Sequence, residues 1–425
     1  MRFELETAQF VINGERIWIK WNNVRQLMND CHEAFMNNVK AGLERRFDAF
    51  RNSGKEVTES IYWNRLNNEI NTISRINADL EKFFLMFRDY ILWLKNNGVG
   101  VGAGCPHSTD SLVMYALEIT DIDPIEHSLV FERFINEEAY AERHYSIMPV
   151  IALFVSEFRP ELFVQFVMEK FGSDCCVVQI DEDLSLYCEE RQFLDKHGFV
   201  DFFIYESNTV KLINNVLQRV NLNCEQSGMV RLDLNQIPLN DEYVLNSLID
   251  SELLSVWKCC DSIQDSEWRL KVKPDCLNDY IVISAITSND LIFERYLDSY
   301  INRKRGLEKI VYLHPCLENI LKETYGLLLF DEQLMMATQV IANFSYSSAD
   351  MFRRDVGKRK TKRCEKWKKK FTEGAAQNGI ELEKALELYD YLCEGLFFTC
   401  SKGYCVSITL DVYRLEYLKH HYPVE

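Results

Sequence analysis

The chain lacks several features that would place it in other classes of protein. Its 425 residues contain no signal peptide and no apolar run approaching about 18 residues, which argues against secretion and against a membrane-spanning helix. Internal repeats and low-complexity linkers are also absent. With 47% apolar and 27% charged residues, the composition is that of a globular protein with two or three domains, which we expect in the cytoplasm.

The spacing of cysteines that is typical of a zinc site is absent as well. The 14 cysteines include the adjacent pairs Cys175-Cys176 and Cys259-Cys260, but no pair is separated by two residues. His314 and Cys316 could form half of a zinc site, but no matching half lies nearby in the sequence. We therefore expect reduced thiols, no disulfide framework and no bound metal.

Charge is unevenly distributed along the chain. The net charge is −17, yet residues 353–370 hold eleven basic and two acidic residues, so this segment carries +9 and the rest carries −26. A basic patch on an acidic body is a plausible phosphate-binding surface. The alternative is a solvated helix face that docks a protein partner.

Local patterns predict both strands and helices. Asn13-Gly14 lies between the strand-like runs Gln9–Ile12 and Ile17–Trp21, an arrangement typical of a β-hairpin. Helical periodicity marks three stretches: about Val24 to Phe50, Tyr62 to the Asn96-Asn97-Gly98 stop, and Pro160 to Gly172.

Residues 96–149 carry the most informative motif of the chain. They contain NNGVGVGAGCPHSTDSLVMYALEITDIDPIEHSLVFERFIN, followed shortly by IMPVIALFV. This order resembles the family C DNA polymerases (the bacterial polymerase III α subunit), which have VGPGRGS, then SLVAYxLxITxxDPLxxxLLFERFLN, then MPDxDxDF. Later segments, such as YGLLLFDEQLMM (325–336) and ADMFRRDVGKRK (349–360), extend the resemblance over roughly residues 60–425.

The resemblance implies an α+β fold with a nucleotidyltransferase-like palm on a small mixed sheet and a mainly helical fingers domain. We expect an N-terminal hairpin and helical segment over 1–60, a palm-like domain over 61–235 and a fingers-like domain over 236–425. The family's thumb is essentially deleted, because only about two dozen residues follow Gly172 before the next shared segment. Within the palm, strands Ser146–Val155 and Val230–Leu234 are expected side by side.

The residues that carry the family's chemistry are missing. Two-metal phosphoryl transfer needs several carboxylates aimed at one point, and alternate residues of a strand supply them. Val150, Ala152 and Phe154 stand where the family places three aspartates, and we expect these apolar positions to include groups that pack against neighbours rather than face an open metal site. Asp233 matches a further metal-binding aspartate, but one carboxylate cannot hold a pair of ions.

The phosphate-binding turn is altered in the same way. The family's Arg-Gly-Ser is here Cys105-Pro106-His107. Pro106 has no backbone N–H, so it cannot donate to a phosphate. The glycines that remain before it are those expected of a helix C-cap and a turn.

We therefore expect a catalytically inactive relative of the polymerase that binds nucleic acid through residues 353–370, and possibly replisome proteins, with no cofactor. The resemblance assigns phosphate contacts to Arg353, Arg354, Lys358, Arg359, Lys360 and Lys402. Two alternatives stay open. One is a DNA polymerase that recruits carboxylates such as Glu157 or Asp181 and then uses Mg²⁺; the other is a phage or mobile-element decoy of a host polymerase.

Overall fold

The computed structural model describes residues 10–13, 16–20, 28, 31–77, 79–142, 149, 151–171, 177–179, 199–249, 271–359 and 361–423. The chain divides into two compact units. The first unit comprises residues 1–126 and 140–236, and the second comprises residues 127–139 and 237–423. The predicted boundaries at residues 60/61 and 235/236 stay a prediction.

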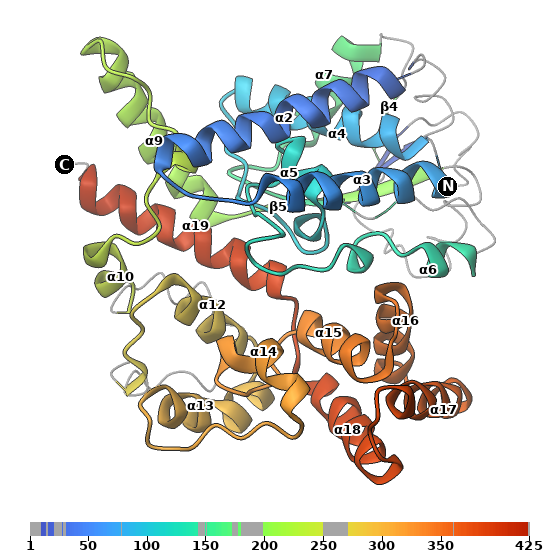
Figure 1. Ribbon diagram of the computed structural model, residues 1–425. Coiled ribbons are helices and arrows are strands. Elements are labelled where there is room, and N and C mark those ends of the chain that lie inside the picture. The colour runs from blue at the N-terminus through green and yellow to red at the C-terminus, as the bar shows by residue number, and fades with distance from the viewer. Residues whose placement is uncertain are drawn as a thin grey trace. The chain divides into compact units, whose positions relative to one another are not determined.

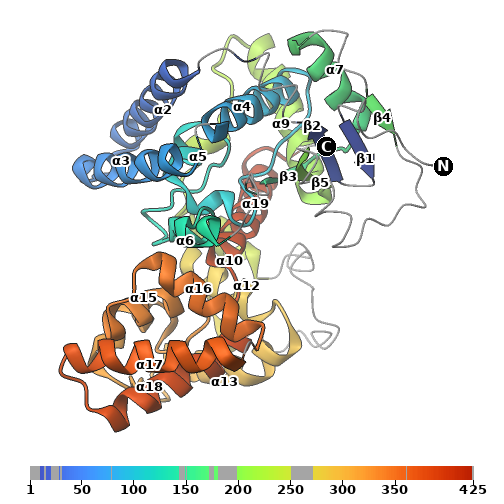
Figure 2. The ribbon, with the colours of Figure 1, turned by 90° about the vertical axis from the view of Figure 1, so that its right-hand side faces the viewer.

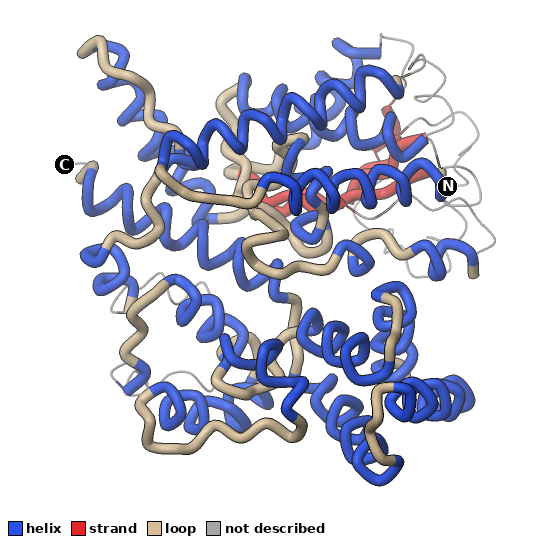
Figure 3. The backbone as a smooth tube through the Cα atoms, viewed as in Figure 1, coloured by secondary structure: helices blue, strands red, loops and turns tan. Residues whose placement is uncertain are grey.

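A small mixed sheet is the centre of the first unit. Its strands are β1 (Phe10–Asn13), β2 (Arg16–Lys20), β3 (Ile151–Val155), β4 (Val177–Gln179) and β5 (Phe199–Glu206), in the order β3-β5-β2-β1-β4. β2 is antiparallel to both β1 and β5, whereas β3 is parallel to β5 and β4 is parallel to β1. The predicted hairpin and the predicted α+β class with a mixed sheet are confirmed, and Figure 3 shows these strands among a majority of helices.

One strand prediction was wrong. Val230–Leu234 is not a strand, and β3 pairs with β5 in the place where we expected this segment. Val230 is 91% exposed, and the chain passes into a short 3-10 helix at Leu234–Gln236. The side chain of Asn221 binds the backbone of Leu232 through an N–H···O bond of 2.7 Å, so a side chain satisfies the donor that a partner strand would have used.

The described part of the first unit also contains helices. They are α2 (His32–Ser53), α3 (Glu59–Ile76), α4 (Asp79–Asn96), α5 (Leu112–Ala116), α7 (Pro160–Phe171) and α9 (Asn208–Gln226). α2 and α3 pack against the short helix α5, and α4 packs against both α2 and α3 (Figure 2). The predicted start of α7 at Pro160 is confirmed. The predicted helical stretch from Val24 to Phe50 is confirmed over α2, and Val24 itself lies outside the described residues.

The second unit is helical in its described part (Figure 1). Its helices are α10 (Glu242–Leu248), α12 (Leu277–Ile286), α13 (Asp290–Lys304), α14 (Glu318–Leu321), α15 (Asp331–Ala342), α16 (Tyr346–Gly357), α17 (Thr361–Gln377), α18 (Leu382–Gly395) and α19 (Lys402–His421). The helix α6 (Glu137–Ala141) lies where the chain returns to the first unit. α15 to α18 share a core that includes Leu334, Phe352, Phe371 and Leu388. None of the described helices combines the length and apolar character needed to cross a membrane.

Candidate functional site

Strand β3 presents two different faces. Ile151, Leu153 and Val155 are buried in the core, whereas Ala152 and Phe154 are half-buried on the opposite face. The ring of Phe154 packs against Tyr205 of β5 with 5.8 Å between centroids. Packing was the predicted role for this face of β3, and Phe154 confirms it; Val150 lies outside the described residues.

The glycine-rich turn is bound to the end of β3. The N–H of Gly102 donates to the carbonyl of Phe154 at 2.9 Å, and the N–H of Gly100 donates to the hydroxyl of Ser156 at 3.0 Å. Gly98 ends α4 with φ +78°, and the N–H of the next residue, Val99, reaches back to the carbonyl of Leu94 at 3.0 Å. Such a 6→1 bond after a left-handed glycine is a Schellman cap. The amides of Gly100 and Gly102 thus serve the turn itself rather than pointing at a ligand.

The turn also has little room beside Cys105, which is buried. A Cβ atom built on the neighbouring Gly104 would lie 2.5 Å from the hydroxyl oxygen of Thr120 and 2.7 Å from a methyl carbon of Thr109. Gly104 is therefore required by packing, because any larger residue would collide with these side chains.

Asp233 lies in a solvent-exposed turn outside the sheet. Its carboxylate accepts the backbone N–H of Asn235 at 2.9 Å and the side-chain amide of Gln236 at 3.4 Å. These are the bonds of an Asx turn, which needs no metal. The described residues of β3 are all apolar, so these strand positions and Asp233 do not fit the divalent cations that the family's reaction requires.

A buried charge network lies in the second unit. Arg133 donates to Asp331 at 2.7 Å and lies 3.3 Å from Glu332, and Arg353 approaches the same Asp331 carboxylate at 3.3 Å. Burial raises the pKa of Asp331, but the guanidinium groups of Arg133 and Arg353 outweigh it, so this pKa lies below the ordinary value. Burial raises the pKa of Glu332 more than Arg133 lowers it, and that pKa lies above the ordinary value.

Two of the predicted phosphate-binding arginines belong to this network. Arg353 and Arg354 both pair with the fully buried Asp350, at 2.8 and 2.7 Å. The ammonium group of Lys402 is equally committed, because it lies 2.8 Å from both carboxylate oxygens of Glu323 and is 2% exposed. A phosphate at any of these three residues would have to displace a carboxylate.

The basic residues of α17 lie on two faces of this helix. Arg363 pairs with the buried Asp355 at 3.3 Å, and Lys370 donates to Ser348 at 3.0 Å. Lys362, Lys366 and Lys369 are spaced four and three apart, so they form one exposed row, which we call the lysine row. Within the described part of the chain, Lys362 and Lys366 have no ion pair, and Lys369 has only a 3.8 Å contact with Glu373.

Two of the predicted sites flank the lysine row, and one lies outside the described residues. Lys358 and Arg359 are exposed at the end of α16, where the guanidinium of Arg359 lies over the Phe397 ring at 5.2 Å from its centroid. Lys360 is not described. The phosphate role of all six predicted residues stays a prediction.

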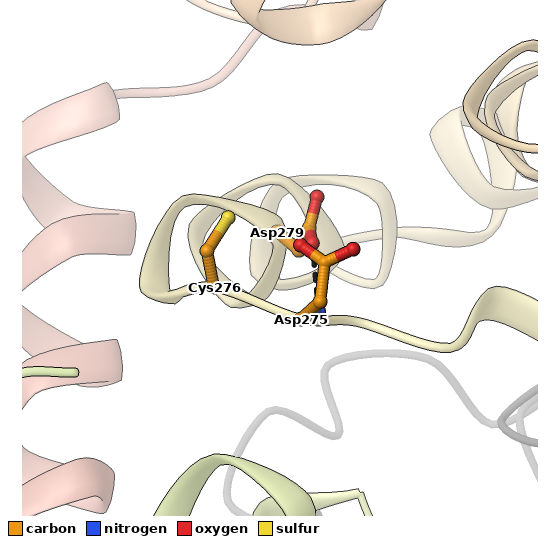
Figure 4. Close-up of side chains that lie close together, drawn as sticks. All are labelled: Asp275, Cys276 and Asp279. Atoms are coloured by element: carbon orange, nitrogen blue, oxygen red, sulfur yellow. Dashed lines mark hydrogen bonds between the residues drawn. The ribbon is translucent and has the colours of Figure 1, made fainter. Parts of the chain in front are cut away.

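One group of side chains in the described residues has the spacing of a metal site. Ligand atoms of Asp275, Cys276 and Asp279 lie within 4.8 Å of one another, and Figure 4 shows them at the start of α12. The ammonium group of Lys304 already lies 3.0 Å from Asp275 and 2.6 Å from Asp279.

Lys304 is therefore the cation of this cluster. Burial raises the pKa of Asp279. Hydrogen bonds from the Asp275 amide, Lys304 and Tyr300 lower it by more than burial raises it, so the pKa of Asp279 lies below the ordinary value. A metal ion would have to displace a half-buried ammonium group, and we assign the cluster a structural role.

The cysteines that the structure describes are not joined in disulfides. His314 lies 3.0 Å from the sulfur of Cys316, and its ring nitrogen also caps the short 3-10 helix Pro315–Leu317. His314 and Cys316 therefore form a local helix cap rather than half of a zinc site.

Sequence reasoning missed Arg133 as the centre of the network. It lies in the FERF motif of residues 131–134, and a charged side chain next to a phenylalanine there is a usable signal for a buried ion pair. Its partner Asp331 is 198 positions away, a separation that no local pattern reveals.

Comparison with known proteins supports one family. The model of the bacterial DNA polymerase III alpha NTPase domain matches residues 33–182, and the model of the bacterial DNA polymerase III alpha subunit finger domain matches residues 209–379.

Individual relatives agree with the two models. The DNA polymerase III subunit alpha of Escherichia coli strain K12 is 26% identical over 91% of this chain. The proteins of the same name from Pseudomonas aeruginosa and Vibrio cholerae serotype O1 are 26% and 25% identical over 90% and 86% of it. The chain spans only 42%, 41% and 40% of the lengths of these three relatives.

Proposed function

Because the chain belongs to the family of bacterial DNA polymerase III α subunits, we propose that it binds nucleic acid as a replication accessory protein and does not itself synthesise DNA. The lysine row of α17 is the observation that carries the binding proposal. Three cations spaced along one helix face can follow the phosphates of a nucleic acid without displacing any buried partner.

The absence of synthesis is proposed from three features of the structure. β3 offers apolar groups in place of carboxylates, the amides of Gly100 and Gly102 are used within the turn, and Arg353 and Arg354 are held by Asp350. Each of these groups would have to stabilise charge in phosphoryl transfer, and none is positioned to do so.

Removing the lysine row tests the binding proposal. Changing Lys362, Lys366 and Lys369 to Gln should weaken binding of every sequence to a similar extent, because phosphate contacts carry no sequence information. The slope of log affinity against log salt should fall by up to about one unit for each contact removed. Fluorescence anisotropy of labelled oligonucleotides over a salt series measures both quantities.

A matched control separates the row from net charge. Changing the exposed Lys40 of α2, Lys95 of α4 and Lys309 of the loop after α13 to Gln removes the same charge elsewhere and should leave the slope unaltered. An unaltered slope in the α17 variant would instead favour a protein partner for this face. Lys368 and Lys370 are unsuitable targets, because they lie against the Tyr389 ring and against Ser348.

The two other functions predicted from the sequence have less support. Glu157, a candidate for a relocated carboxylate, pairs with Arg159 at 2.9 Å two residues after β3, and Asp181 lies outside the described residues. A decoy of a host polymerase would share the same fold, and it would differ from an accessory protein in capturing the host polymerase's partners without supporting replication.

A further inference from the structure

The half-buried face of the sheet in the first unit carries aromatic side chains. Phe203 and Tyr205 alternate along β5, and their rings are parallel within 4° at 5.9 Å between centroids. Phe154, the register partner of Tyr205, adds the third ring at 5.8 Å. We call these three residues the ring ladder.

The position of the ring ladder is unusual for a sheet. The opposite face, with Ile151, Leu153 and Ile204, is buried and forms the core. The second face of a sheet that has one buried face is normally polar. Three partly exposed aromatic rings in a row therefore indicate a surface that binds something flat and apolar.

Basic positions continue the same rows of the sheet. The register places Arg16 of β2 opposite Phe203, and β2 reads Arg-Ile-Trp-Ile-Lys, so Arg16, Trp18 and Lys20 occupy alternate positions. Asp201 of β5, paired with Trp18, is the acidic position in this part of the sheet. Arg16 is therefore a basic position in the row of Phe203, and Asp201 is an acidic position in the next row.

We propose that this face binds single-stranded nucleic acid by stacking bases on the ring ladder. This rests on the proposed function and specifies its ligand. Aromatic residues on a sheet stack bases in several unrelated folds, and they bind single strands because bases in a duplex have no free face. The small Ala152, the register partner of Phe203, leaves space beside the first ring.

The experiment compares a fluorescein-labelled oligo-dT with a duplex hairpin of equal length at low salt. The wild-type protein should prefer the single strand. Changing Phe154 and Tyr205 to Leu keeps apolar volume on the strands, and it should weaken binding to the single strand by at least about fivefold for each ring removed. The duplex affinity and the salt slope should not change, because no phosphate contact is removed.

Two controls keep the result interpretable. Tyr205→Phe retains the ring and should bind like the wild type. The lysine-row variant should weaken both ligands and reduce the salt slope, which is the opposite pattern to the ring variant.

Cross-linking to the wild-type protein does not depend on the folding of any variant. Oligonucleotides that carry 5-iodouracil form cross-links with aromatic residues stacked on the base, and mass spectrometry should locate them in the peptides containing Phe154, Phe203 or Tyr205. Equal binding of single strand and duplex, with cross-links elsewhere, would overturn this inference and leave the proposed function standing. No binding of either ligand by the wild type would overturn the proposed function.

Discussion

At the scale of single residues, Arg133 is the most consequential side chain of the second unit. Its side chain is 3% exposed, and it neutralises Asp331 while also facing Glu332. A buried pair of this kind gains little over an apolar pair of the same shape, but removing one partner leaves an uncompensated charge. The neighbouring Arg353 contacts the same carboxylate but is also needed by Asp350, so it cannot substitute fully.

We predict that Arg133→Met lowers the free energy of unfolding by about 3–5 kcal/mol. Since the folded pKa of Asp331 lies below its unfolded value, this carboxylate stabilises the fold above the unfolded pKa of about 3.9, and the stabilisation is lost as pH falls through the folded pKa. Without Arg133 the folded pKa should rise, so acid unfolding should begin at a higher pH.

Urea titrations from pH 3 to 7 measure both effects. Arg159→Met, which removes an exposed pair with Glu157, is the control and should change stability by less than about 1 kcal/mol. A stability and acid midpoint equal to those of the wild type would show that Arg353 alone neutralises Asp331. Arg133→Lys should fall between the wild type and the Met variant, because it keeps the charge and loses the guanidinium geometry.

At the scale of helices, Gly374 allows α17 to dock on α15. A Cβ atom at this position would lie 2.0 Å from the carbonyl oxygen of Ala342, a backbone atom that cannot move independently. Intrinsic helix propensity favours alanine over glycine by about 1 kcal/mol, but an overlap with backbone costs more than that.

We therefore predict that Gly374→Ala destabilises the second unit by about 1–3 kcal/mol. Gly357→Ala, in α16, is the matched control, since the nearest atom to its added Cβ would be 3.7 Å away. That control should be neutral or slightly stabilising. Thermal melts of both variants decide between the two effects, and a stabilised Gly374→Ala would mean that α17 does not cross α15 this closely.

The elements also show what could be predicted from the sequence. The start of α7 at Pro160 could be predicted, because proline is favoured in the first turn of a helix. The β1–β2 hairpin could be predicted from the Asn-Gly pattern, which is equally local. Val230–Leu234 was expected to be a strand from the family resemblance, but a strand also needs a partner. Here the side chain of Asn221 takes the amide of Leu232 and β5 takes the edge of β3.

The candidate site could also be predicted only where local sequence determines it. The apolar residues of β3 can be read directly from the sequence, and strand alternation places Ala152 and Phe154 on one face, so this face was expected to pack. The pairing of Arg353 with Asp331 was not, since it depends on how α15 and α16 lie together. The ring ladder could not be predicted from the sequence, because Phe154 and Tyr205 meet only through the parallel pairing of β3 with β5.

At the scale of the whole molecule, the net charge of −17 opposes the approach of any nucleic acid. Screening limits that repulsion to about 10 Å at 0.1 M salt, so exposed lysines can still act locally. Affinity should remain in the micromolar to millimolar range of non-specific contacts unless another surface adds to it. The ring ladder is such a surface, and its contribution should persist at salt concentrations that abolish phosphate contacts.

The last prediction concerns synthesis by the whole chain. We expect no primer extension with Mg²⁺ or Mn²⁺, because the defects are separate: apolar residues on β3, amides consumed in the glycine turn, and arginines held by Asp350. Repairing one of them should not restore activity. Ala152→Asp with Phe154→Asp would place two carboxylates on β3, but Asp233 lies in a turn outside the sheet and cannot complete a metal pair.

The double variant should instead be destabilised. It loses the Phe154–Tyr205 ring contact and places two like charges on a half-buried face, at a cost of a few kcal/mol. Primer extension and urea unfolding are measured on the same preparations, with an active family C polymerase as the positive control for the assay. Extension by the wild type would establish an enzyme with relocated carboxylates. Extension by the double variant alone would show that the loss of the β3 aspartates is the single defect, and that the turn and the arginines can still serve the reaction.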